Sequence, residues 1–81
     1  MQNDAIIHEI KEIVSQVTGL MPEEFGVDDS MVQDIGLSSF EITSIVRAIE
    51  KRFQTEIPTQ RLRSIVTIRD FADYIGDDGS R

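Results

Sequence analysis

Two adjacent serines, Ser38 and Ser39, have the clearest capacity for chemistry in this sequence. They lie in the segment 34–41, which reads DIGLSSFE. A serine hydroxyl becomes a catalytic nucleophile when a neighbouring base, most often a histidine, activates it. The chain has one histidine, His8, and no cysteine, so neither a Ser–His nor a Cys–His nucleophile system is predicted. We therefore expect a protein that is not an enzyme in its own right.

The same segment contains the start of a helix. Ser38 and Glu41 match the capping box, in which each side chain accepts a hydrogen bond from the other residue's backbone amide. Apolar residues then recur at three- and four-residue spacing and predict a helix that runs to about Gln54. These residues are Ile42, Ile45, Val46, Ile49 and Phe53. Taken alone, this pattern makes Ser38 an N-cap and leaves Ser39 without a special role.

Another helix is predicted near the N-terminus. Asn3 and Asp4 can cap its start, and Gly19 follows as a stop. Its apolar residues are Ile6, Ile7, Ile10, Ile13, Val14 and Val17. The connection 19–37 is longer than an idle loop in a small domain, so it is either functional or packed on the core through its own apolar side chains.

Two more helix starts are predicted in the last third of the chain. Thr59, after Pro58, can cap a short helical turn through Arg63, and Thr67 with Asp70 resembles a second capping box. The apolar face of the last helix consists of Ile68, Phe71, Ala72 and Ile75. No segment shows the two-residue alternation of a strand. The predicted fold is an all-α four-helix bundle with three main helices, one short helix and a long first loop.

Length and charge narrow the class of protein. The 81 residues suit one domain at 1–81, with an ordered core at about 4–76 and a frayed polar tail at 77–81. The net charge is −7, and residues 1–39 hold eight acids against one base. This charge disfavours nucleic acid and anionic lipid, and no apolar run is long enough to cross a membrane. We expect a cytoplasmic monomer whose partners present basic surfaces.

The segment DIGLSSFE and the order of the predicted helices resemble the acyl carrier protein family. The family signature is an Asp, an apolar residue and Gly-Leu or a similar pair, followed by Asp-Ser-Leu at the start of the second helix. Residues 56–58 and 71–75 also fit, so the resemblance covers essentially the whole chain. It implies that Ser39 carries 4′-phosphopantetheine and that Phe40 stands in the place of the Leu.

The resemblance implies a carrier function. A separate phosphopantetheinyl transferase would attach the group to Ser39, and the group would supply a thiol that holds an acyl, polyketide or aminoacyl intermediate as a thioester. The other expected partners are acyl-loading and acyl-processing enzymes of fatty acid or polyketide biosynthesis. The alternative is an unmodified acidic interaction or regulatory domain that keeps the same helical fold.

The second helix departs from the family in two ways. Ser38 replaces an Asp whose carboxylate, in the family, helps to hold metal and to meet the transferase. The helix is strongly acidic in the fatty-acid carriers but has mixed charge here: Glu41, Glu50, Arg47, Lys51 and Arg52. If these bases only form a solvated helix face, Arg47 is expected to pair with Glu50 and to be mildly repelled by Lys51. We expect partners to dock on a specialised face formed by Ser38, Phe40, Glu41, Thr43, Ser44, Arg47 and Lys51.

Apolar side chains in the second helix and in residues 65–71 could also enclose a pocket for an acyl chain. They are Ile42, Val46, Ile49, Ile65, Ile68 and Phe71. Because any small helical bundle needs the same pattern for its core, a filled core is the favoured interpretation.

Overall fold

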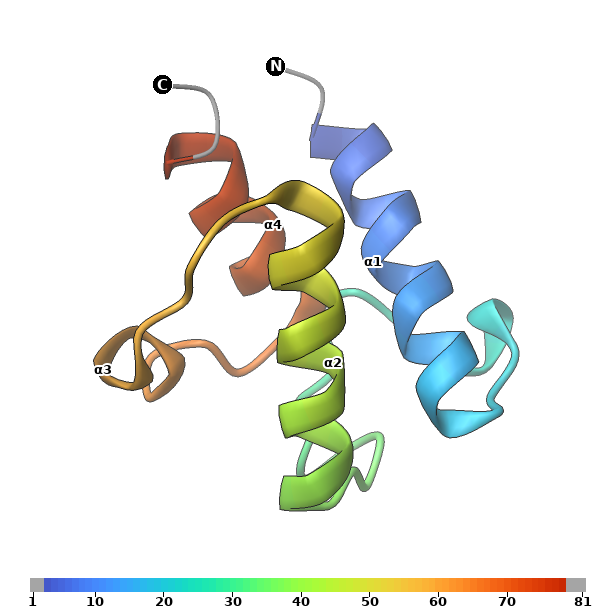
Figure 1. The fold of residues 1–81 in the computed structure, drawn as a ribbon. Coiled ribbons are helices and arrows are strands. Elements are labelled where there is room, and N and C mark those ends of the chain that lie inside the picture. The colour runs from blue at the N-terminus through green and yellow to red at the C-terminus, as the bar shows by residue number, and fades with distance from the viewer. Residues whose placement is uncertain (1–2, 79–81) are drawn as a thin grey trace.

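Helices form the regular structure of the chain. The computed structural model describes residues 3–78 and contains α1 (Asn3–Thr18), the 3₁₀ turn η1 (Pro22–Glu24), α2 (Ser39–Phe53), α3 (Thr59–Leu62) and α4 (Ile68–Asp78) (Figure 1). No strand occurs within this range. The prediction of an all-α fold with three main helices and one short helix is confirmed. None of the described helices combines the length and apolar character needed to cross a membrane.

The three long helices each bury one face in a common core. α1 packs against both α2 and α4. The buried helical side chains are Ile6, Ile10, Ile13 and Val14 of α1, Ile45, Val46 and Ile49 of α2, and Ile68, Phe71, Ala72 and Ile75 of α4. Burial of each large apolar side chain contributes roughly 1.5–3 kcal/mol, so the helical periodicity seen in the sequence is what holds the bundle together.

The long connection between α1 and α2 is packed against this core. Its buried side chains are Phe25, Met31 and Leu37. The Met31 amide donates to the Val66 carbonyl at 3.0 Å, and the Arg69 amide donates to the Val27 carbonyl at 3.0 Å. Of the two explanations for its length, packing on the core is therefore confirmed.

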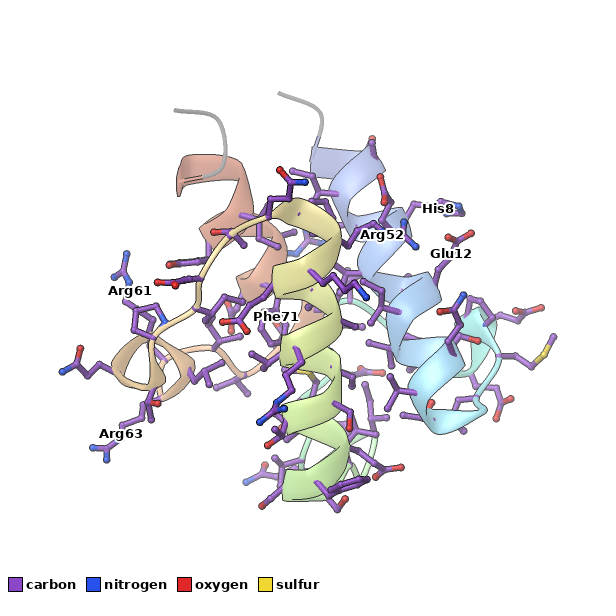
Figure 2. The ribbon with its side chains drawn as sticks, in the orientation of Figure 1. His8, Glu12, Arg52, Arg61, Arg63 and Phe71 are labelled. Carbon is purple, nitrogen blue, oxygen red and sulfur yellow. The ribbon has the colours of Figure 1, made fainter. Side chains whose placement is uncertain are left out.

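Two ion pairs join elements that are distant in the sequence. Arg69 Nε donates to Asp28 Oδ1 at 2.7 Å, and this hydrogen bond holds the pKa of the Asp28 carboxyl below its ordinary value. Arg52 of α2 pairs with Glu9 of α1, and Figure 2 shows the Arg52 side chain on the side of α2 that faces α1. Both pairs lie at the surface, so each fixes geometry more than it adds stability.

Two helices end on residues with a left-handed backbone. Gly19 follows α1 with φ of 82°, a conformation that glycine adopts without steric cost, and its amide donates to the Ser15 carbonyl at 2.8 Å. Gln54 ends α2 with φ of 52°, and its amide donates to the Glu50 carbonyl. Both helices therefore end where the sequence predicted.

Three other boundaries differ from the prediction. Asn3 is already inside α1 rather than before it. Thr59 lies inside α3 and is not its cap; Pro58 occupies the cap position without a side-chain hydrogen bond, because its ring holds φ at −64° in the extended backbone that a cap requires. α4 continues to Asp78, beyond the expected end of the core, because no proline interrupts it. The rest of the expected tail, 79–81, lies outside the described residues.

Candidate functional site

The start of α2 is fixed by the predicted capping box. Ser38 Oγ accepts from the Glu41 amide at 3.2 Å, and the Ser38 amide donates to Glu41 Oε1 at 2.9 Å. The Ile42 amide donates to the Ser38 carbonyl at 3.0 Å and closes the first turn. Gly36, with φ of 82°, turns the chain into this cap. Ser38 therefore has a structural role, and Ser39 is the first residue of the helix.

Ser39 presents its hydroxyl to solvent. The residue is exposed, and no group within residues 3–78 hydrogen-bonds to its Oγ. The amides of Ser39 and Phe40 also lack an acceptor in this part of the chain, because the Ser38 side chain satisfies only the amide of Glu41. An open hydroxyl beside two open amides at the positive end of a helix dipole suits an ester to an anionic group.

The residues expected to form the docking face lie along the exposed side of α2. Phe40 is 80% exposed, although it is a large aromatic residue. Thr43, Arg47 and Lys51 are exposed and Ser44 is half-buried. Ser38 and Glu41 take part in the capping box instead. The structure thus brings together the side chains that the sequence predicted, while their role in docking stays a prediction.

One expected contact on this helix is wrong. Glu50 does not pair with Arg47, because its Oε2 accepts from the Ile57 amide at 2.8 Å. That amide follows the end of α2 in a half-buried loop and would otherwise lack an acceptor. Among the described residues, Arg47 and Lys51 consequently have no ion-pair partner.

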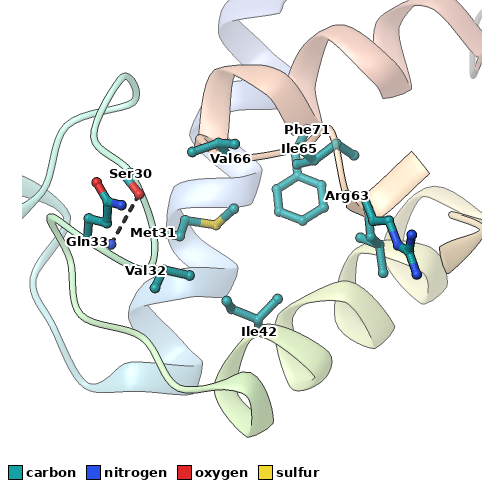
Figure 3. A pocket seen from close by; sticks show the side chains of 10 residues that line it. Ser30, Met31, Val32, Gln33, Ile42, Arg63, Ile65, Val66 and Phe71 are labelled. Carbon is teal, nitrogen blue, oxygen red and sulfur yellow. Dashed lines mark hydrogen bonds between the residues drawn. The ribbon is translucent and has the colours of Figure 1, made fainter. Parts of the chain in front are cut away.

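A pocket of about 340 Å³ opens beside the first turns of α2 (Figure 3). Its lining residues are Ser30, Met31, Val32, Gln33, Ile42, Leu62, Arg63, Ile65, Val66 and Phe71. Three of them were predicted as pocket residues: Ile42, Ile65 and Phe71. The other three predicted residues, Val46, Ile49 and Ile68, are buried in the core and do not line the pocket, whereas Phe71 belongs to both.

The favoured interpretation of these residues as core is confirmed for Val46, Ile49, Ile68 and Phe71, and the pocket lies at the outer edge of that core. Residues from 30–33 and 62–66 line the pocket on the sides away from α2, and Ile42 lines it on the side of α2 (Figure 3). The Met31–Val66 hydrogen bond joins these two segments to each other rather than to α2. Apart from Ile65, the residues of these two segments show no periodic pattern that marks them as a lining.

Comparison with known proteins identifies the family. Residues 8–75 match the family described as phosphopantetheine attachment site. The chain is 35% identical over 71 residues to the acyl carrier protein of Wolinella succinogenes, covering 88% of this chain and 93% of that protein. It is 27% identical over 71 residues to the acyl carrier protein of Campylobacter fetus subsp. fetus, covering 88% and 92%. The chain belongs to the acyl carrier protein family.

Membership of the acyl carrier protein family gives the function and the prosthetic group. The chain carries acyl intermediates as thioesters on covalently attached 4′-phosphopantetheine. Its function is therefore to hold intermediates for enzymes that process them. Nothing in these similarities favours the alternative of an unmodified interaction domain.

Proposed function

We propose that Ser39 is the residue of this acyl carrier protein that receives 4′-phosphopantetheine. The observation that carries the proposal is the exposed hydroxyl of Ser39 beside the open amides of Ser39 and Phe40. Ser38, the only adjacent serine, is engaged as the helix cap. When bound, the group supplies the thiol on which an acyl intermediate is held as a thioester.

The chain's own residues bind and orient the group rather than activate its attachment. The two open amides and the dipole of α2 favour the negative charge of a phosphodiester at Ser39. The only histidine, His8, lies on α1, where its Nε2 is 3.3 Å from Glu12 Oε2 (Figure 2). Because no histidine is available at Ser39, a separate phosphopantetheinyl transferase supplies the base that removes the hydroxyl proton.

The same end of α2 serves as the docking face in this proposal. The transferase and the acyl-loading and acyl-processing enzymes approach Ser39 and contact the side chains around it: Phe40, Thr43, Ser44, Arg47 and Lys51. The exposure of Phe40, Thr43, Arg47 and Lys51 supports this role. We also propose that the carrier works as a cytoplasmic monomer, since a net charge of −7 keeps copies apart.

The pocket beside α2 is the proposed shelter for the acyl chain. Ile42 lies three residues after Ser39 on the same face of the helix, so the pocket and the attachment site are on one side of α2. Most of the lining side chains are apolar, among them Met31, Ile65 and Phe71. Each buried methylene of an acyl chain is stabilised by about 0.8 kcal/mol, which favours occupation of the pocket.

The attachment site is tested by two serine substitutions. Each variant is incubated with coenzyme A and a permissive phosphopantetheinyl transferase, and its intact mass is measured. Ser39→Ala should gain no mass and keep its helix content. Ser38→Ala should still be modified, although its free energy of unfolding should fall by about 0.5–2 kcal/mol because the cap is lost. Peptide mapping that locates the group on Ser38 would contradict the proposal.

A further inference from the structure

The exposed face of α2 presents one aromatic ring and two cations. Phe40, Ser44, Arg47 and Lys51 follow one another at four-, three- and four-residue spacing, so they lie on one side of the helix. At 1.5 Å of rise per residue, Arg47 is roughly 10 Å and Lys51 roughly 16 Å along the axis from Phe40. The face is therefore long enough for a partner enzyme to contact the aromatic ring and both cations.

Among the described residues, the acids of α2 form no ion pair with these cations. The Glu41 carboxylate is held by the Ser38 amide at 2.9 Å, and the Glu50 carboxylate is held by the Ile57 amide at 2.8 Å. Both carboxylates keep their negative charge, but their hydrogen bonds go to backbone amides rather than to Arg47 or Lys51. The remaining cation, Arg52, pairs with Glu9 on the side facing α1 (Figure 2).

The line of side chains from Phe40 to Lys51 therefore carries two cations and no acid, on a protein that is acidic as a whole. Arg47 and Lys51 have no ion-pair partner within residues 3–78, whereas the whole chain has a net charge of −7. Residues 1–39 carry the entire excess of negative charge. The two cations of this face therefore contrast with the acidic first half of the sequence.

Phe40 gives this face an apolar anchor. The side chain is 80% exposed, the most of any large apolar residue in the described part of the chain. Aromatic residues are enriched among the few interface residues that dominate binding energy. In a complex, a partner would bury the Phe40 ring as an anchor, and the charges further along α2 would lie in the rim of the interface.

We propose that the partner enzymes of this carrier dock through a pocket for Phe40 flanked by carboxylates that pair with Arg47 and Lys51. This inference rests on the proposed function, in which Ser39 is the attachment site. It replaces the expectation from net charge alone that partners present basic surfaces. An acidic docking surface attracts the cations on the exposed face of α2 and so favours encounters through the helix that Ser39 begins.

The test uses one broad-specificity phosphopantetheinyl transferase prepared in two forms. The forms differ at two positions on the carrier-binding surface, which are glutamates in one form and lysines in the other. The full-length carrier is incubated with coenzyme A at low ionic strength, and the rate of modification is followed by intact mass. The wild-type carrier should be modified about tenfold faster by the glutamate form, because rim charges act chiefly on association rate.

Matched variants separate the local face from net charge. R47Q/K51Q and A5E/Q16E each lower the net charge from −7 by two units to −9, and Ala5 and Gln16 are exposed on α1. R47Q/K51Q should lose the preference for the glutamate form, whereas A5E/Q16E should keep it. R47E/K51E should prefer the lysine form. Raising the salt concentration should reduce every one of these preferences.

Two failures are distinguishable in this design. If Ser39 is modified at the same rate in all carriers by both transferase forms, the acidic docking surface is wrong and the attachment site stands. A wild-type preference for the lysine form leads to the same conclusion. If peptide mapping finds the group away from Ser39, the proposed function is wrong and this inference falls with it.

Discussion

The starts of α2 and α4 use the same capping chemistry. In α2, Ser38 and Glu41 exchange hydrogen bonds of 3.2 and 2.9 Å. In α4, the Asp70 amide donates to Thr67 Oγ1 at 3.1 Å, and the Thr67 amide donates to Asp70 Oδ2 at 3.1 Å. Both boxes were predicted from three-residue spacing in the sequence and are confirmed. Local sequence therefore explains why a helix begins at each place.

The surroundings of the two helix starts are opposite. The first residue of α4, Ile68, is fully buried, and the amide of its second residue, Arg69, is held by the Val27 carbonyl. The first two residues of α2, Ser39 and Phe40, are exposed with open amides. The chain closes one helix end with its own loop and leaves the other open. Tertiary packing, rather than the capping motif, thus decides which end is available to a ligand.

The largest expected difference in the free energy of unfolding is between a substitution at the buried start of α4 and one at the exposed start of α2. Ile68→Ala should lower the free energy of unfolding by about 2–5 kcal/mol, because it opens a cavity in the core. Phe40→Ala should change it by no more than about 0.5 kcal/mol, because the ring is mostly in solvent. Denaturant unfolding measures both values.

A conservative variant keeps this prediction testable if Ile68→Ala does not fold. Ile68→Val should cost about 0.5–1.5 kcal/mol, since it removes one methylene from the same site. A loss of several kcal/mol in Phe40→Ala would contradict the comparison, because it would mean that the ring is packed in solution.

Removal of either cap should have an intermediate effect on the free energy of unfolding. This effect should be similar at the starts of α2 and α4. Ser38→Ala and Thr67→Ala should each lower the free energy of unfolding by about 0.5–2 kcal/mol, because each leaves one helix amide without its acceptor. Ser38→Asp is the control, since aspartate is an equally good cap, and it should keep the wild-type stability. If either Ala variant is as stable as wild type in denaturant unfolding, the box at that helix is dispensable.

The smallest expected effect concerns the ion pair between Arg69 and Asp28, which lies beside the start of α4. The pKa of Asp28 is lowered from its ordinary value of 3.8 by the hydrogen bond from Arg69, and then by the charge of Arg69. Because the pKa is lower in the folded chain, the pair stabilises the fold above pH 3.8, and this contribution is lost as the pH falls through the folded-state pKa. A carboxyl-detected NMR titration should show the depressed value.

Two arginine variants control that titration. Arg69→Gln should return the pKa of Asp28 toward its ordinary value. Arg63→Gln removes an exposed arginine without an ion-pair partner among the described residues, so it should leave the Asp28 titration unchanged. A depressed pKa that survives Arg69→Gln would show that another group holds the Asp28 carboxylate. Added salt should shrink the difference, because the pair is exposed.

Most of the fold could be predicted because its determinants are local. Apolar periodicity predicted α1, α2 and α4, and the two capping boxes predicted where α2 and α4 begin. The cap of α3 was wrong because a threonine and a proline are adjacent there, and the fixed backbone of Pro58 made the hydroxyl of Thr59 unnecessary.

The site could be predicted in part. The position of Ser39 and the exposure of Phe40 follow from the phase of α2, which is a local property. The pocket does not follow from a local property, because its lining residues come from segments that meet through the hydrogen bond between Met31 and Val66. The position of Glu50 depends on a loop amide at Ile57 in the same way. Contacts between distant segments leave no periodic mark in the sequence.

The capping box at Ser38 also bears on regioselectivity and on quality control. In an unfolded chain, two neighbouring serine hydroxyls are nearly equivalent nucleophiles, and nothing directs a transferase to one of them. Folding engages the first as an acceptor for the Glu41 amide and leaves the second free at the helix start. With Ser39 as the attachment site, a transferase that recognises this geometry modifies native chains and passes over misfolded ones.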